Sequence, residues 1–218
     1  MTENLDDLAA VAALTDRVRR AAYEAVAATR GTPVGRDEVA ETLGIGRTLA
    51  AFHLDKLVDA GLLEVSYARR SGRTGPGAGR PAKLYHLAAA EHAVSVPPRA
   101  YRAAAELLAE ALERTGADET LNKVARQHGR QAGSGHGDPA GLLTEHGYAP
   151  VADPDEPDRI TLANCPFHRL AEQFPPLICG MNLAMISGLL EGGGLDWTAR
   201  MDPAAGRCCV SLCKNKTD

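Results

Sequence analysis

Two short helices joined by a glycine turn constrain the fold of this chain more than any other feature. Apolar residues recur at helical spacing over residues 36–43 and again over 47–60. Between them, Gly44-Ile45-Gly46 predicts a tight turn, and Gly61 can cap the end of the second helix. The apolar stripes of both helices are therefore expected to face one core.

A basic hairpin is predicted directly after this helix pair. Residues 62–67 and 83–87 read as short strands, and the segment between them is rich in glycine, arginine and proline. Residues 69–83 carry five cations and no acid, whereas residues 1–96 as a whole are neutral. Such concentrated positive charge indicates local contact with a polyanion. Ahead of the pair, Thr15 and Asp16 can cap a further helix, and residues 1–13 are expected to be a frayed lead.

The order of helix, glycine turn, helix and basic hairpin is that of a winged helix-turn-helix, whose second helix enters the major groove of DNA. The candidate DNA-binding residues are Arg47, Thr48, Ala51, Phe52 and Lys56 on the second helix, and Arg69, Arg70, Arg73 and Arg80 in the hairpin loop. Arg47 can pair with a guanine edge or a phosphate, and Ala51 or Phe52 can meet a thymine methyl. The loop arginines can reach phosphates or the minor groove. Aromatic residues make up only 4% of the chain, which argues against base stacking on single strands.

The stretch DEVAETLGIGRTLAAFHLDKLVDAGLLEV, followed by GRPAKLYHL, resembles the ArsR/MarR-type winged-helix regulators of bacteria over roughly residues 14–88. The resemblance implies that double-stranded DNA is a partner. Pro97-Pro98 marks a boundary, and helices are predicted over 99–114 and 119–131. These helices are expected to form a homodimer that reads a pseudo-palindromic site. The expected domains are a winged helix over 1–96, dimerisation or linker helices over 97–135, and a cysteine-rich sensor over 136–218.

All five cysteines lie in the last quarter of the chain: Cys165, Cys179, Cys208, Cys209 and Cys213. Their odd number and close spacing indicate metal, cofactor or redox chemistry more than structural disulfides. Cys165 follows a predicted strand over 159–163, and Cys179 begins a predicted helix that ends near Leu190. In a terminal strand over 208–213, alternation places Cys208 on the core side and turns Cys209 and Cys213 away from it.

The segment NCPFHRLAEQFPPLICGMNLAMISGLLEG, with the later RCCVSL, resembles the C-terminal sensor of SufR-like regulators. These are winged-helix repressors that carry an iron–sulfur cluster and control cluster-assembly genes. The resemblance implies a cluster, [4Fe-4S] in preference to [2Fe-2S], held by Cys165, Cys179 and Cys208. The fourth ligand is Cys209, Cys213 or His168, because imidazole can also ligate cluster iron. The resemblance also implies that the cluster-bound protein represses its target genes.

Several alternatives stay open at this stage. Zinc is the rival metal, but only Cys209-x3-Cys213 has the spacing of a zinc knuckle. A thiol–disulfide switch through Cys208 or Cys209 is another possibility, and residues 138–200 could enclose a small organic ligand. The sequence shows no arrangement typical of an enzyme. An acidic N-terminus and the lack of an 18-residue apolar run predict a cytoplasmic chain without a membrane span. The expected fold class is α+β and mostly helical.

Overall fold

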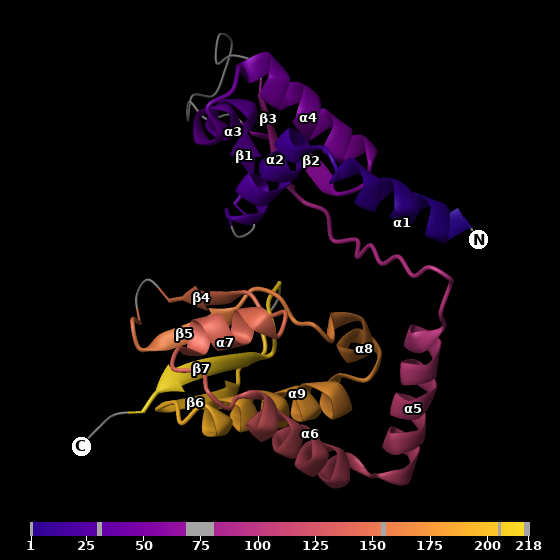
Figure 1. Cartoon of the computed structure of the whole chain (residues 1–218), viewed down its shortest axis with the longest axis vertical. Helices are drawn as coiled ribbons and strands as arrows, with labels where there is room; N and C mark the ends of the chain where they lie inside the picture. The colour runs from indigo at the N-terminus through magenta and orange to yellow at the C-terminus, as the bar shows by residue number, and fades with distance from the viewer. Residues whose placement is uncertain (1, 30–31, 69–80, 154–155, 205, 216–218) are drawn as a thin grey trace. The chain divides into compact units, whose positions relative to one another are not determined.

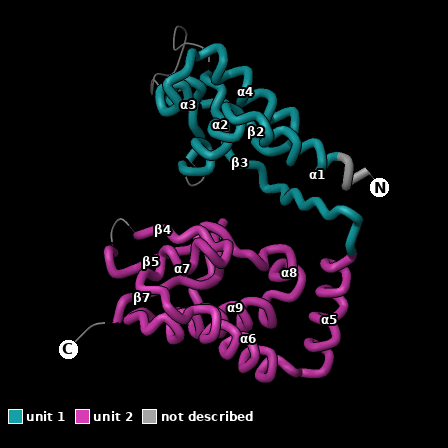
Figure 2. Tube along the Cα trace, in the orientation of Figure 1, with its two compact units in different colours: residues 1–99 teal, residues 100–218 magenta. Residues whose placement is uncertain are grey.

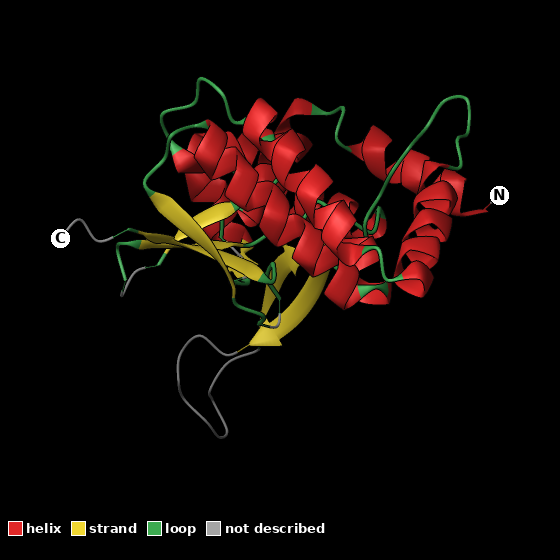
Figure 3. Ribbon diagram, turned by 90° about the horizontal axis from the view of Figure 1, so that it is seen from below, coloured by secondary structure: helices red, strands yellow, loops and turns green. Residues whose placement is uncertain are grey.

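The computed structural model describes residues 2–29, 32–68, 81–153, 156–204 and 206–215. They divide into two compact units, residues 1–99 and 100–218, which Figure 2 colours separately. The predicted central segment, residues 97–135, falls almost entirely within the second unit. Both units are mixed α+β, with more helix than strand and one small antiparallel sheet each (Figure 3). None of the described helices has both the length and the apolar character needed to cross a bilayer.

The described residues of the first unit form four helices and a three-stranded sheet (Figure 1). The helices are α1 (Thr2–Ala13), α2 (Arg17–Ala27), α3 (Arg36–Leu43) and α4 (Arg47–Asp59). The strands β1 (Val34–Gly35), β2 (Leu63–Ala68) and β3 (Ala82–Leu87) pair antiparallel in the order β1-β3-β2. Gly44 ends α3 with a φ of 64°, a left-handed conformation that suits glycine. The predicted helix pair, its glycine turn and the two long strands are therefore confirmed.

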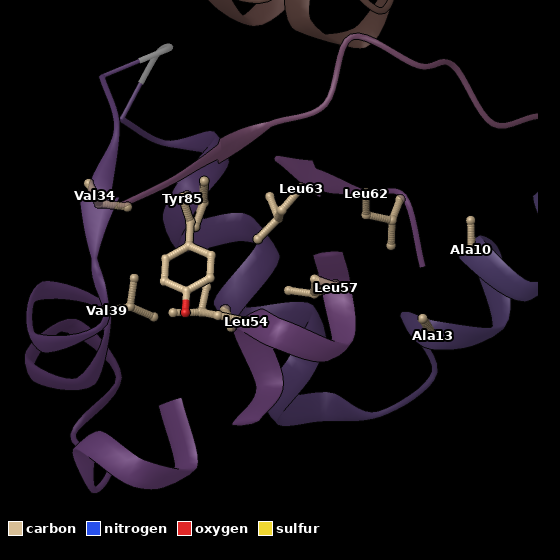
Figure 4. Packing of buried hydrophobic residues seen from close by; sticks show 11 residues of the cluster. Ala10, Ala13, Val34, Val39, Leu54, Leu57, Leu62, Leu63 and Tyr85 are labelled. Carbon is tan, nitrogen blue, oxygen red and sulfur yellow. The ribbon is translucent and has the colours of Figure 1, made fainter. Parts of the chain in front are cut away.

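The core of the first unit lies where α4 and β3 meet (Figure 4). Leu54 and Leu57 of α4 are fully buried, and the Tyr85 ring reaches down beside them. The Tyr85 hydroxyl donates a hydrogen bond to Asp55 Oδ1 at 2.9 Å, and Lys83 Nζ donates to the same oxygen at 2.6 Å. This network attaches the hairpin to the second helix of the pair.

The expectation of a frayed lead is wrong, because residues 2–13 form the helix α1. Ala10 and Ala13 are buried in the same core as Leu57 and Leu62. Alanine has the highest intrinsic helix propensity, so this alanine-rich segment needs only a small packing surface to hold its conformation.

Five helices and a four-stranded sheet make up the part of the second unit that the structure describes. The helices are α5 (Tyr101–Thr115), α6 (Asp118–Ala132), α7 (Pro139–Glu145), α8 (His168–Gln173) and α9 (Pro175–Gly192). The strands β4 (Pro150–Ala152), β5 (Arg159–Leu162), β6 (Trp197–Met201) and β7 (Val210–Lys214) pair antiparallel in the order β4-β5-β7-β6. The predicted strand over 159–163 is confirmed as β5, and the predicted terminal strand over 208–213 is present as β7, which begins later, at Val210. Leu142, Leu162, Ile186 and Leu212 form the centre of the core.

Helices α6 and α9 run side by side in the same direction, with their backbones in direct contact (Figure 1). Gly129 and Gly133 of α6 face Met185 and Leu189 of α9, and Gly188 and Gly192 of α9 face Arg126 and Arg130 of α6. A Cβ added at any of the four glycines would overlap a backbone carbonyl oxygen of the other helix. Glu191 of α9 accepts hydrogen bonds from both of those arginines, including one at 2.5 Å from Arg130 Nε. The packing fixes α9 firmly against α6.

Candidate functional site

Four of the five cysteines lie together in the second unit. Cys165 follows β5, Cys179 lies on α9, and Cys208 and Cys209 directly precede β7. Cys165 and Cys208 lie on either side of one buried amide, whose Nδ2 is 4.0 Å and 3.2 Å from their sulfurs. Cys209 neighbours Cys208 and Cys179. Three separate elements of the unit therefore supply thiols to one place. This group of four is called the cysteine group below.

A half-buried ion network positions the corner that carries two of these thiols. Asp202 Oδ2 accepts hydrogen bonds from Arg159 Nη2 at 2.6 Å and from Arg207 Nη2 at 2.9 Å. The two guanidinium groups lower the pKa of Asp202 to about 2. The backbone N–H of the same aspartate donates to the carbonyl of Cys209 at 2.7 Å. The turn between β6 and β7 is thereby held next to β5, and Cys208 is held with it.

The prediction that Cys209 points away from the other cysteines is wrong. Strand alternation does not apply to it, because β7 begins only at Val210. Cys213 does lie in β7, where it pairs with Thr198 of β6, four residues beyond Cys209. No described contact joins Cys213 to another cysteine, so the structure leaves this candidate ligand outside the group.

Two further expectations about this region change. Cys179 does not begin its helix, since α9 starts at Pro175 and the cysteine lies in the second turn. His168, the other candidate fourth ligand, is the first residue of α8, and its side chain is 67% exposed. Its Nε2 lies 3.2 Å from Glu172, one turn along the same helix. The sequence spacing of four between these two residues is typical of such a surface pair.

The thiols of the cysteine group shift one another's pKa in opposite directions. The pKa of Cys208 is lowered, chiefly because the Cys165 thiol donates to it, with further help from Asn182. The same contact raises the pKa of Cys165. Burial raises the pKa of Cys209 to about 12. Of these three thiols, Cys208 therefore loses its proton most readily.

A buried amide completes the site and was missed in the sequence. Asn182 of α9 has no exposed surface, and its Nδ2 lies 3.2 Å from Cys208 Sγ and 4.0 Å from Cys165 Sγ. Its Oδ1 accepts a hydrogen bond from the Tyr148 hydroxyl at 2.5 Å. The available signal was a polar residue in an apolar helix, one turn after Cys179 and on the same face.

The donor set favours some ligands over others. Within the described parts of the chain, no three His, Cys, Asp or Glu side chains are arranged to hold a single metal ion. A zinc ion needs its ligands on one tetrahedron with bonds of about 2.3 Å to sulfur. An iron–sulfur cluster spreads its thiolate ligands over several iron atoms and prefers cysteine sulfur. Cys165, Cys208 and Cys209 pack against the apolar core and supply soft sulfur donors of the type that both metals accept.

The described DNA-binding candidates all lie on α4. The Arg47 guanidinium is paired with Asp37 of α3, with Nε 2.5 Å from Oδ1 and a second bond from Nη2. Phe52 is 52% exposed, Thr48 is exposed and Ala51 is half-buried. Lys56 Nζ lies 3.2 Å from a carboxylate oxygen of Asp59. The hairpin arginines Arg69, Arg70, Arg73 and Arg80 lie outside the described residues.

Comparison with known proteins finds no matching family, no similar curated protein and no similar solved structure. The function must therefore be inferred from the residues and contacts of the chain itself.

Proposed function

We propose that this protein is a winged-helix transcriptional regulator whose second unit senses iron–sulfur or redox status through a cysteine-ligated iron–sulfur cluster. The observation that carries the proposal is the cysteine group, in which four thiols from three separate elements neighbour one another in turn around the buried Asn182 amide. Cys165, Cys179, Cys208 and Cys209 are the proposed ligands. A [4Fe-4S] cluster matches their number at one thiolate for each iron.

The protein's own residues determine how ligand binding acts on the fold. A bound cluster would supply a redox-active centre that soft thiolates stabilise. Cys165 would then join the end of β5 to α9 through Cys179, and Cys208 would join both to β7. Because ligand binding to the folded state stabilises that state, loss of the ligands would loosen these elements. The second unit would therefore have a more stable state with the cluster bound and a less stable state without it.

The exposed face of α4 supports DNA as the partner. Arg47 uses Nε and Nη2 to bind Asp37, which leaves the Nη1 hydrogens for a guanine edge or a phosphate. Leu49 and Phe52 are large apolar side chains left exposed on the same helix, and both suit contact with thymine methyl groups. Strand β2 ends just before the basic segment 69–80 and β3 begins just after it, which is the order that the wing of such a fold requires.

An apolar face on α5 supports assembly as a homodimer. Tyr101, Leu107 and Leu108 are each more than 60% exposed, and only Ala109 of this helix is buried. Large side chains of this kind are usually covered when they cluster on one helix. We therefore propose that α5 packs against a second copy, so that two α4 helices read a pseudo-palindromic site in the cytoplasm.

The cysteine contacts also favour a second candidate, a regulator that responds to oxidants without a cluster. Cys165 neighbours Cys208, and Cys179 neighbours Cys209, so these are the two pairs in which an oxidant would form a disulfide. Two thiols and one molecule of hydrogen peroxide would give one disulfide and two molecules of water.

The deciding experiment is anaerobic purification followed by a visible spectrum and by iron, sulfide and zinc analysis. The wild type is expected to hold iron and sulfide in equal amounts. Cys209→Ser is expected to lose them, whereas Cys213→Ser, the matched substitution at the far end of β7, is expected to retain them. Stoichiometric zinc without sulfide would contradict the proposal. Metal-free protein that peroxide converts to a disulfide form would favour the second candidate.

A further inference from the structure

The packing of the apolar core does not explain why residue 182 is an asparagine. Asn182 is completely buried in a helix whose neighbouring residues Ile178 and Ile186 are also buried and apolar. A buried amide is unfavourable unless its donors and its acceptor are satisfied by hydrogen bonds. An apolar side chain would fill the same space without that requirement. Hydrogen bonding, and not packing, therefore accounts for an amide at this position.

The orientation of this amide is fixed by its partners. The Tyr148 hydroxyl donates to Oδ1 at 2.5 Å, and Tyr148 itself is only 4% exposed. The carbonyl side of the amide therefore faces the tyrosine, and the NH₂ side faces sulfur, 3.2 Å from Cys208 and 4.0 Å from Cys165. Sulfur at these distances is an acceptor for an N–H donor.

We infer that Asn182, held by Tyr148, is the positioning residue of the cysteine group and raises the reduction potential of the cluster that these cysteines hold. The inference rests on the proposed function. Hydrogen bonds to the ligand sulfurs are among the protein features that tune cluster potentials. An N–H directed at a ligand sulfur withdraws negative charge from it, so it favours the reduced form of the centre, which carries one more electron. Tyr148 contributes by preventing the amide from turning its oxygen toward the sulfurs.

Two variants and one control test this role. Asn182→Leu removes the donor, and Tyr148→Phe keeps the donor but releases the amide. Ser187→Ala is the control, because Ser187 lies on the same helix and bonds only to the carbonyl of Leu183, at 2.8 Å. The anaerobically purified full-length proteins are titrated with mediators while the visible absorbance is recorded, and the cluster-free proteins are compared by circular dichroism.

Both variants are expected to shift the midpoint potential to more negative values, Asn182→Leu by more than Tyr148→Phe, while Ser187→Ala leaves it unchanged. A structural role alone would lower the unfolding temperature without moving the potential. If Asn182→Leu does not fold, Tyr148→Phe decides, because it removes a single oxygen atom. Unchanged potentials in folded variants would overturn the role of Asn182 and leave the proposed function intact. A wild-type protein without a cluster would overturn the proposed function itself, and this role with it.

Discussion

The contact between α6 and α9 predicts that one methyl group destabilises the second unit. Gly188 of α9 lies so close to α6 that an added Cβ would overlap the carbonyl oxygen of Arg126 and approach the backbone nitrogen of Arg130 to 3.0 Å. Both neighbours are backbone atoms, so no side chain can move aside to make room. Gly188→Ala can be accommodated only if the two helices separate.

The same helix provides a matched control. At Gly180, an added Cβ would meet only the Asn122 side chain, at 3.6 Å, which is an ordinary van der Waals contact. Replacing a helical glycine by alanine adds up to about 1 kcal/mol of helix propensity at either position. Overpacking a close contact costs about 1–3 kcal/mol, and the upper end applies where backbone must move. Gly188→Ala should therefore be destabilising by about 2 kcal/mol, and Gly180→Ala neutral or stabilising by up to about 1 kcal/mol.

The single tryptophan makes the assay specific for this unit. Trp197 is the first residue of β6, so its fluorescence reports on the unit that contains α6 and α9. At roughly 4 °C for each kcal/mol in a domain of this size, the two variants should differ in unfolding temperature by about 8–12 °C. Equal unfolding temperatures for Gly188→Ala and Gly180→Ala would refute the close packing of the two helices.

Three further outcomes are expected. For DNA duplexes selected from a randomised library, the affinity of Arg47→Ala should be about 10–100-fold lower than that of the wild type, with a weaker preference at one base pair. Lys56→Ala should bind all sequences more weakly to the same extent, and the slope of log affinity against log salt concentration should fall by about 1. Leu108→Glu should convert the dimer to a monomer in sedimentation velocity, and an unchanged dimer would exclude α5 as the interface. The folded-state pKa of Asp202, about 2, lies below the usual value of 3.8, so its stabilising contribution is complete above about pH 4 and is lost as the pH falls toward 2. In Asp202→Asn, the urea concentration at which half of the second unit is unfolded should therefore depend less on pH between pH 4 and pH 2 than it does in the wild type.

Local signals were sufficient to predict most of the regular structure. Asp16 accepts a hydrogen bond from the Arg19 backbone N–H at 2.9 Å and begins α2, as its type and position predict. Gly44 ends α3, and the predicted terminal strand is present as β7, although Ser211 is buried as well as Val210 and Leu212. Each of these features depends on residues within a few positions of one another.

The features that could not be predicted from the sequence depend on contacts between residues that are far apart in the chain. Cys209 reaches the cysteine group because it precedes β7, which begins only at Val210. The start of this strand is set by its pairing with β6 and β5. Asn182 acquires its role from Tyr148, which lies 34 residues earlier in the chain. The pairing of Arg47 with Asp37 depends on how α3 packs against α4. Spacing alone carries no information about such partners.

The most direct test of the whole account is the DNA affinity of the protein with and without its cluster. An operator-like duplex is selected from a randomised library by the anaerobic wild-type protein, and binding is measured by fluorescence anisotropy at fixed ionic strength before and after the iron is removed with a chelator. The account predicts that affinity changes at least about tenfold, which corresponds to a coupling free energy of about 1.4 kcal/mol. Cys213→Ser should behave like the wild type, and Cys179→Ser should behave like the iron-free protein. Equal affinity in both states would contradict the claim that the cysteine group controls DNA binding.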